Sequence, residues 1–155
     1  MAETLVERIG GPARRQRVLD DCVRLIDDEM RSKSGLMSIP IKGGYKVVTG
    51  LKPGFVRHAM DSLLDDFCIA LEPFYRQWQD APKEKRPGLG EALKRDENKV
   101  ADALLGVTDA RAARAQHQTL KSLYGKLRGM AKTHVIAALP GLGRTIQPHV
   151  VDVSA

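Results

Sequence analysis

The segment from residue 13 to residue 32, ARRQRVLDDCVRLIDDEMRS, carries the pattern that decides the fold. Its apolar side chains recur at intervals of three and four residues, with arginine and aspartate between them. Positions with this spacing share one face of an α-helix. The segment therefore predicts an amphipathic helix of about five to six turns, whose apolar face must pack against the rest of the chain. The residues of that face are Val18, Cys22, Leu25, Ile26 and Met30.

The same period recurs towards both ends of the chain. At the start, Thr4 and Glu7 form a capping-box pattern, which predicts a short first helix. A helix is expected from Pro53 onwards, and Pro73 should kink or interrupt it. The apolar stripe of that helix consists of Val56, Met60, Leu63, Leu64, Phe67 and Leu71.

Glycines and prolines set the expected ends of the later helices. The segment Glu91–Leu105 predicts a helix that ends near Gly106, and Thr108 is placed to cap another that begins at Asp109. A last long helix is expected from about Thr119 to Leu139, with Pro140 and Gly141 ending it.

These elements predict an all-α fold, a compact single-domain bundle of five to seven helices in a chain of 155 residues with 43% hydrophobic composition. Residues 1–11 are expected to form a short N-terminal helix and linker, residues 80–90 a surface loop, and residues 140–155 a C-terminal tail. Residues 36–51 are expected to form a shorter helix, with a strand over residues 45–49 as the alternative.

Several classes of chemistry find no support in the sequence. Cys22 and Cys68 lie far apart inside apolar helical patterns, which indicates buried thiols rather than a disulfide scaffold or a zinc site. No local motif for a catalytic nucleophile, a metal or a nucleotide is present, so we expect neither enzyme activity nor a cofactor. The acidic start and the lack of a long apolar run predict a cytoplasmic protein without a transmembrane segment.

Charge is unevenly distributed along the chain. Residues 1–109 hold 18 basic and 18 acidic side chains, whereas residues 110–155 hold seven basic and one acidic, so the net charge of +6 arises in the last third. This distribution predicts a non-catalytic binding or adaptor protein that docks on an anionic partner: an acidic protein surface, nucleic acid or lipid head groups. The alternative is ordinary surface pairing, in which the basic helices pack beside the acidic segments at residues 20–29 and 61–66. The expected binding residues are Arg111, Arg114, Lys121, Lys126, Arg128 and Lys132.

Three other interpretations remain open. Methionines at 30, 37, 60 and 130, with kinks at Pro40 and Pro73, suggest a carrier that holds an apolar ligand between helices. Residues 100–118 resemble a degenerate helix-turn-helix with its turn at Gly106, which would make the chain a DNA-binding protein. Gly125 and Gly129 lie one turn apart and predict a close helix contact, either inside the bundle or across a homodimer.

Several short motifs distributed over most of the chain, taken together, resemble an uncharacterised family of small bacterial proteins. The resemblance implies a bacterial cytoplasmic setting, and it brings no activity and no site residues. The motifs are Ser32-Lys33-Ser34-Gly35, Ile41-Lys42-Gly43-Gly44-Tyr45, Lys52-Pro53-Gly54-Phe55-Val56, Ala70-Leu71-Glu72-Pro73-Phe74, Val107-Thr108-Asp109-Ala110-Arg111 and Tyr124-Gly125-Lys126-Leu127-Arg128-Gly129.

Overall fold

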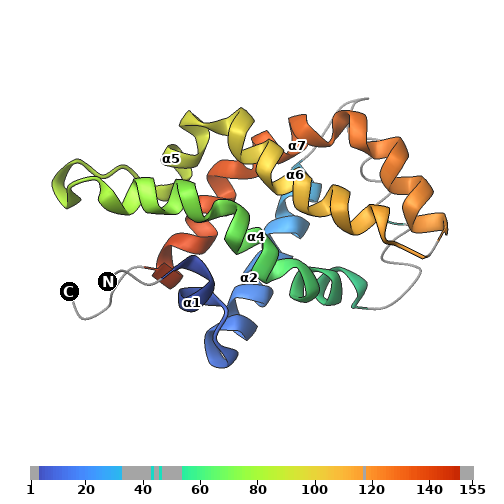
Figure 1. The fold of residues 1–155 in the computed structure, drawn as a ribbon, viewed down its shortest axis with the longest axis horizontal. Coiled ribbons are helices and arrows are strands. Elements are labelled where there is room, and N and C mark those ends of the chain that lie inside the picture. Colours follow the sequence, from blue (N-terminus) through green and yellow to red (C-terminus); the bar gives the residue numbers. More distant parts are fainter. Residues whose placement is uncertain (1–3, 33–42, 44–45, 47–53, 117, 151–155) are drawn as a thin grey trace.

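The described part of the chain consists of helices joined by short turns and contains no strand, which confirms the all-α prediction (Figure 1). The structure is a computed structural model that describes residues 4–32, 43, 46, 54–116 and 118–150. The expected element at residues 36–51 lies almost wholly outside them. The described elements are α1 (Leu5–Ile9), α2 (Pro12–Ser32), α4 (Phe55–Asp80), the single 3-10 turn η2 (Lys83–Lys85), α5 (Leu89–Arg95), α6 (Glu97–Ala113) and α7 (Gln118–Val150).

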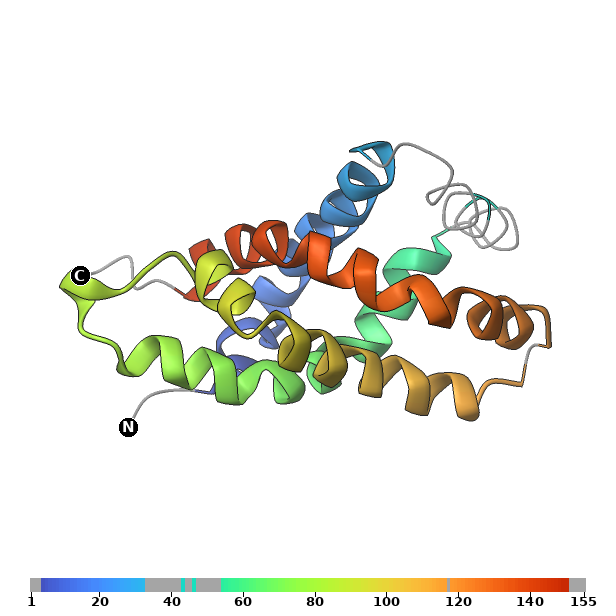
Figure 2. The same cartoon turned by 90° about the horizontal axis from the view of Figure 1, so that it is seen from above.

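Helix α7 organises the packing of the other helices. It runs along most of the length of the molecule and contacts α1, α2, α5 and α6 (Figure 2). Helix α4 packs against α1, α2, α5 and α6. Helix α6 and the first half of α7 lie side by side and are joined at the right of both views, so they form an antiparallel pair (Figures 1 and 2). We call residues 97–132 of this pair the α6–α7 hairpin.

One cluster of buried side chains lies between these helices. The apolar periods predicted its members well on α2 and α4, where Val18, Cys22, Leu64 and Leu71 are buried. Both cysteines are buried free thiols, as predicted. The cluster continues past the expected end of the α4 stripe with Tyr75 and Trp78, whose ring centroids lie 6.2 Å apart.

The N-terminal capping box is present as predicted. The Glu7 amide donates to the Thr4 hydroxyl and the Thr4 amide donates to the Glu7 carboxylate. The Leu5 amide donates to Glu72 Oε2 at 2.7 Å, which fastens the start of α1 to α4. Ion pairs join α2 to α4 as well, with Arg15 2.7 Å from Asp61 and 2.9 Å from Asp65.

Helices α4 and α7 are not interrupted by their prolines. Helix α4 is continuous through Pro73, so the expected interruption there is wrong, and the kink stays a prediction. Pro73 lies on the exposed side of the helix, where water can solvate the Ile69 carbonyl that lacks a donor. Helix α7 continues through Pro140 and Pro148 to Val150, so residues 140–150 are not a tail. Tertiary packing outweighs the lost hydrogen bonds there, because Leu139, Ile146 and Val150 are buried in the core.

Polar contacts also hold the end of α7 in place. The His149 ring lies 2.7 Å from Asp21 of α2, and the carbonyls of His149 and Val150 accept hydrogen bonds from Arg14 and Arg8. The last turns of α7 therefore belong to the folded body.

The helix-turn-helix interpretation of residues 100–118 is also wrong. Helix α6 is continuous from Glu97 to Ala113 and passes through Gly106 without a turn. A glycine inside a helix costs about 1 kcal/mol, and the burial of Val100 and Leu105 on the same helix offsets this. Thr108 caps no helix, since its hydroxyl bonds back to the Leu105 carbonyl. The chain breaks instead at Asp96, which separates α5 from α6.

Helices α5 and α7 approach each other backbone to backbone. A Cβ atom added at Gly90 would lie 2.6 Å from the Pro140 carbonyl oxygen, and one added at Gly143 would overlap the backbone nitrogen and Cα of Gly90. The Leu89 amide donates to Gln147 Oε1 at 2.9 Å across this contact. Gly90 and Leu89 are therefore buried, although the sequence placed them in the surface loop 80–90.

Candidate functional site

A cavity of about 200 Å³ lies inside the bundle and is partly open to the surface. Helices α2, α4, α6 and α7 supply most of its wall, for example Leu25, Met60, Leu104 and Val135. Among the residues that the structure describes, Thr108 is the single wall residue with a polar side chain, and no nitrogen or oxygen atom of this wall is exposed to the cavity. The described wall is thus purely hydrocarbon and sulfur.

The size and chemistry of the cavity suit a small apolar molecule. A buried water needs two to four polar partners, so a space lined only by apolar atoms stays dry. An engineered apolar cavity of about 150 Å³ in another protein binds benzene or xenon. An empty void also forfeits dispersion contacts that an apolar occupant would restore. The cavity between α2, α4, α6 and α7 therefore combines enough space with a driving force for occupation.

Two cysteines lie in the cavity wall. Burial raises the pKa of Cys22 to about 11 and, together with the nearby Asp65 carboxylate, raises the pKa of Cys68 to about 12. The thiolate is the nucleophilic form of cysteine, so both side chains are poor nucleophiles at neutral pH. In this site they act as small apolar groups.

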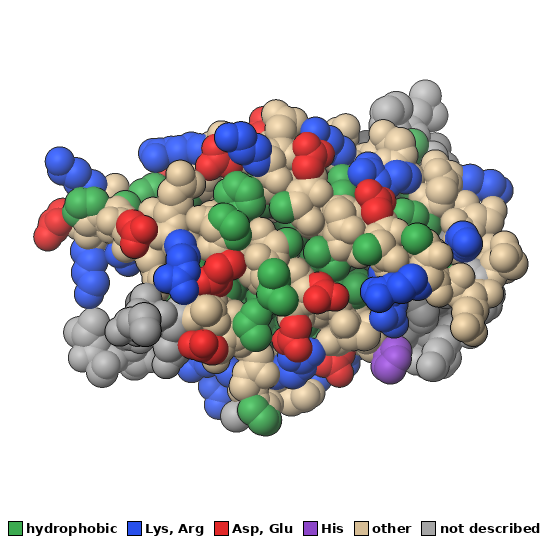
Figure 3. Space-filling model, in the orientation of Figure 1, with side chains coloured by type: hydrophobic (Ala, Val, Ile, Leu, Met, Phe, Trp, Pro, Cys, Tyr) green, Lys and Arg blue, Asp and Glu red, His purple; other side chains and the backbone are tan. Residues whose placement is uncertain are grey.

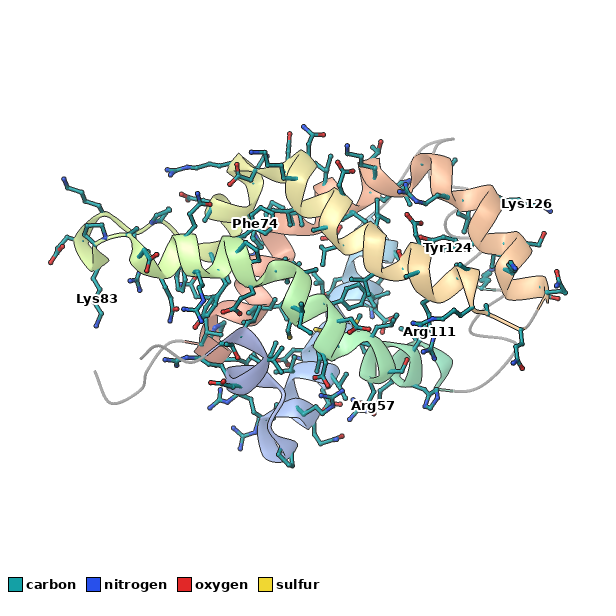
Figure 4. The ribbon with its side chains drawn as sticks, in the orientation of Figure 1. Arg57, Phe74, Lys83, Arg111, Tyr124 and Lys126 are labelled. Carbon is teal, nitrogen blue, oxygen red and sulfur yellow. The ribbon has the colours of Figure 1, made fainter. Side chains whose placement is uncertain are left out.

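A chain of hydrogen bonds lies directly behind Thr108. The Thr108 hydroxyl lies 2.8 Å from the Tyr124 hydroxyl, and the Tyr124 hydroxyl donates to Asp109 at 2.5 Å. Arg128 donates to the same carboxylate at 2.7 and 3.1 Å. Tyr124 points from α7 towards α6, between the two helices (Figure 4). We call Thr108, Tyr124, Asp109 and Arg128 the polar chain of the α6–α7 hairpin.

The charges of the polar chain are mutually stabilising. The hydrogen bonds from Arg128 and Tyr124 lower the pKa of Asp109, so its carboxylate is ionised at neutral pH. Burial and the hydrogen bond to Asp109 raise the pKa of Tyr124, so its hydroxyl keeps its hydrogen. The sequence offered no sign of this arrangement, because its two members on α6 lie 15 to 20 positions before its two members on α7.

The six residues predicted to bind an anion fall into two groups. Arg128 and Lys132 lie 2.7 and 3.0 Å from Asp109 and Asp102, so α6 supplies carboxylates to the supposedly acid-free third. Lys132 lies one turn after Arg128 on α7, and both side chains meet acidic residues of α6. Both cations are therefore paired, although with α6 and not with the acidic segments at residues 20–29 and 61–66 that the alternative named.

Arg111, Arg114, Lys121 and Lys126 make up the second group, and all four are exposed. Lys126 points outward at the end of the hairpin, and Arg111 points towards the start of α4 (Figure 4). We call these four residues the hairpin cations. Basic side chains also lie at the opposite end of the same face, so positive charge is not confined to the hairpin (Figure 3).

The glycine contact predicted within the bundle is wrong. At Gly125 and Gly129 an added Cβ would meet no atom within 4 Å, so no neighbouring helix of the described bundle needs a glycine there. The homodimer alternative stays a prediction. The close approach occurs instead at Gly90 and Gly143, in a segment that the sequence assigned to a loop and a tail.

Of the methionines that suggested a carrier, Met60 lies in the cavity wall, whereas Met30 and Met130 are not among its described residues. Met37 and Pro40 lie outside the described residues. Sequence reasoning placed half of the described wall residues on the apolar faces of α2 and α4. It did not identify a cavity, because those faces signalled core positions without signalling that the core is incompletely filled.

Other kinds of site are not seen in the parts of the chain described above. Within them no three His, Cys, Asp or Glu side chains lie close enough to hold a metal ion. Over the same residues, no helix combines the length and hydropathy needed to cross a membrane.

Comparison with known proteins places the chain in a family. No curated protein and no solved structure matches it. The profile of one protein family does match, over residues 5–150, which includes every helix described above. The resemblance to an uncharacterised family is therefore confirmed, and the chain belongs to a family of unknown function, DUF6918.

Proposed function

We propose that the protein binds a small apolar molecule in the cavity between α2, α4, α6 and α7 and acts as a non-catalytic carrier. The observation that carries this proposal is the described wall of the cavity, which exposes no nitrogen or oxygen atom over a space of about 200 Å³. Natural ligand pockets are concave and mostly apolar, and this one lies between helices of a bundle, where such pockets commonly occur. We place the protein in the bacterial cytoplasm on the strength of the sequence motifs quoted above.

The proposal is tested by filling the cavity from its own wall. Val135 is a partly buried wall residue on α7, and Val135→Phe would put a ring into the space. Ile69 is 62% exposed on α4 and is not a wall residue, so Ile69→Phe makes a similar change away from the cavity. Benzene is titrated into each isotope-labelled protein and followed by NMR, with circular dichroism as the check on folding.

The expected result is saturable binding of benzene to the unaltered protein and to Ile69→Phe, with shifts confined to wall residues, and binding lost in Val135→Phe. Absence of saturable binding to the unaltered protein would refute the proposal. Equal binding by both variants would place the bound molecule elsewhere. Native mass spectrometry of protein from its own host then asks whether an apolar molecule is retained.

The hairpin cations favour a second candidate function, docking on an anionic partner. Within residues 110–150 there is no acidic side chain to offset them, and among the described residues Arg128 and Lys132 already neutralise Asp109 and Asp102. Attraction of this kind is sequence-independent and falls with salt. Acidic protein, nucleic acid and lipid head groups are all candidate partners.

A charge-reversal pair tests this second function. The variant Arg114→Glu/Lys121→Glu/Lys126→Glu alters the hairpin, and Lys83→Glu/Lys85→Glu/Lys94→Glu makes the same change of six charge units on exposed residues outside it. Binding to duplex DNA and to anionic vesicles is measured over a salt series. Docking through the hairpin requires that the first variant loses binding and the second keeps most of it. Similar losses in both would leave only the net charge as the cause.

A further inference from the structure

The carbon atoms of the Thr108 side chain face the cavity, and its hydroxyl oxygen faces the hairpin. It belongs to the cavity wall, yet no oxygen atom of the described wall is exposed there. The hydroxyl oxygen lies 3.0 Å from the Leu105 carbonyl oxygen and 2.8 Å from the Tyr124 hydroxyl. The one polar side chain in the described wall is therefore turned away from any occupant.

The donors and acceptors of the polar chain explain why the Thr108 hydroxyl faces the hairpin. Asp109 is an ionised acceptor held by Arg128, so the hydrogen between Asp109 and Tyr124 comes from Tyr124. The Tyr124 oxygen can then only accept from Thr108. The single hydroxyl hydrogen of Thr108 goes either to Tyr124 or to Leu105, and in neither case is it available to a ligand.

We propose, building on the proposed function, that the cavity takes an uncharged hydrocarbon group, and that Thr108, held by the polar chain of the hairpin, sets this selectivity. A polar group that enters the cavity beyond its opening would leave its water and find no exposed partner in the described wall. Burying a hydroxyl without a hydrogen bond weakens binding by roughly five- to a hundredfold. A carboxylate loses far more, because an isolated charge is excluded from an apolar site. The volume suits one ring or a short alkyl group, since a space of about 150 Å³ accepts benzene.

Three ligands that share a ring test the selectivity. Benzene has no polar group, phenol adds one hydroxyl, and benzoate adds a charge. Affinities come from the same NMR titration, and contacts between ligand protons and the Thr108 methyl group locate the bound molecule. We expect benzene to bind at least about fivefold more tightly than phenol and benzoate not to bind.

Variants of the polar chain test the role of Thr108. In Tyr124→Phe the threonine loses one partner, and because threonine in a helix divides between two χ1 rotamers, its hydroxyl can turn towards the cavity. The ratio of benzene to phenol affinity should then fall at least threefold. Tyr75→Phe removes a phenolic oxygen from a buried residue that is not in the described wall, and the ratio should not change. Thr108→Val removes the hydroxyl itself, and the ratio should stay at least as high as in the unaltered protein.

Each failure has a different meaning. Phenol binding as tightly as benzene would overturn the selectivity and leave the proposed function standing. A ratio unchanged in Tyr124→Phe, or lowered in Thr108→Val, would overturn the role of Thr108. Failure of all three ligands to bind the folded, unaltered protein would reject the proposed function and this inference together.

Discussion

Two glycines on the same helix should respond in opposite directions to the same substitution. Gly143 faces the backbone of Gly90, and an added Cβ would overlap backbone atoms of α5. Gly129 lies in the earlier part of α7, where an added Cβ would meet nothing within 4 Å. We predict that Gly143→Ala destabilises the protein and that Gly129→Ala stabilises it.

The structure sets the size of both effects. Overpacking a core costs about 1–3 kcal/mol when side chains can move aside, and here the obstacle is backbone, so we expect about 3 kcal/mol or more for Gly143→Ala. Replacing a helical glycine by alanine gains about 1 kcal/mol where space is free. For a chain of this length 1 kcal/mol corresponds to about 2–4 °C in Tm. Tm should therefore fall by roughly 6–12 °C or more for Gly143→Ala and rise by roughly 2–4 °C for Gly129→Ala.

Urea unfolding and thermal melts of the two variants, each with the unaltered protein alongside, measure this difference. Similar m-values would show that both variants unfold from a comparably compact state. A neutral Gly143→Ala would refute the close approach of α5 to α7. A destabilising Gly129→Ala would show that this glycine is covered in solution, and a dependence of Tm on protein concentration would then identify the homodimer contact.

Three further predictions concern the cavity, the polar chain and the first helix. Folding raises the pKa of Cys22 from 9.0 to about 11 and that of Cys68 to about 12, which lowers their thiolate populations at pH 8 about 100-fold and about 1,000-fold. Both thiols should therefore react with N-ethylmaleimide more slowly than in the unfolded chain by these factors. Fast labelling of the native protein, followed by mass spectrometry, would contradict this. Because folding lowers the pKa of Asp109, this carboxylate stabilises the protein fully above its unfolded pKa of about 3.9, and the stabilisation is lost as the pH falls through the folded pKa. Asp109→Asn should therefore reduce the dependence of stability on pH between about pH 5 and 2, measured by urea unfolding. An unchanged dependence would count against the ionised pair with Arg128. Glu72→Ala removes the acceptor of the first amide of α1, so the free energy of unfolding should fall by about 1 kcal/mol and hydrogen exchange should become faster in α1 alone. Faster exchange throughout the protein would mean that α1 does not open separately.

Hydrophobic period was the reliable signal in this sequence. It predicted the faces of α2 and α4 because burial of one stripe is what fixes the orientation of a helix against its neighbours. The capping pattern at Thr4 and Glu7 was equally reliable, since it involves only residues within one turn.

Glycine and proline misled the prediction of helix ends. Their local cost is about 1 and 3 kcal/mol, and a helix continues where packing on both sides of the residue outweighs that cost. Pro140 is followed by the buried residues Ile146 and Val150, and Gly106 follows the buried Leu105. The same residue types also hid the contact of Gly90 with Gly143, because a glycine that permits close helix packing looks like a loop signal in the sequence.

Charge counted along the chain differs from charge arranged in space. Residues 110–155 contain seven basic residues and one acidic residue. Helix α6 nevertheless lies beside α7 and brings Asp102 to Lys132 and Asp109 to Arg128. An antiparallel pair of helices places residues from before and after its turn side by side, so a boundary drawn at the turn separates partners. The four hairpin cations are a narrower and more testable surface than the acid-free stretch suggested.

The cavity is a property of the packing and not of any one helix. Each of its walls has an ordinary amphipathic face, and an apolar period is the same whether the opposite face fills the space or leaves part of it open. What distinguishes a cavity is the sum of side-chain volumes across four helices, including the small side chains of Cys22, Cys68 and Thr108 at positions where a leucine would also satisfy the period.

If the space were an accident of loose packing, enlarging Cys68 to leucine should stabilise the protein. An accidental apolar void of this size also binds benzene, so benzene binding and stability alone do not distinguish the two cases. If the space is kept for a ligand, protein from its own host should carry an apolar molecule, and Cys68→Leu should lose it. Retention of such a molecule by the unaltered protein and its loss in Cys68→Leu therefore separate a site from a defect of the core.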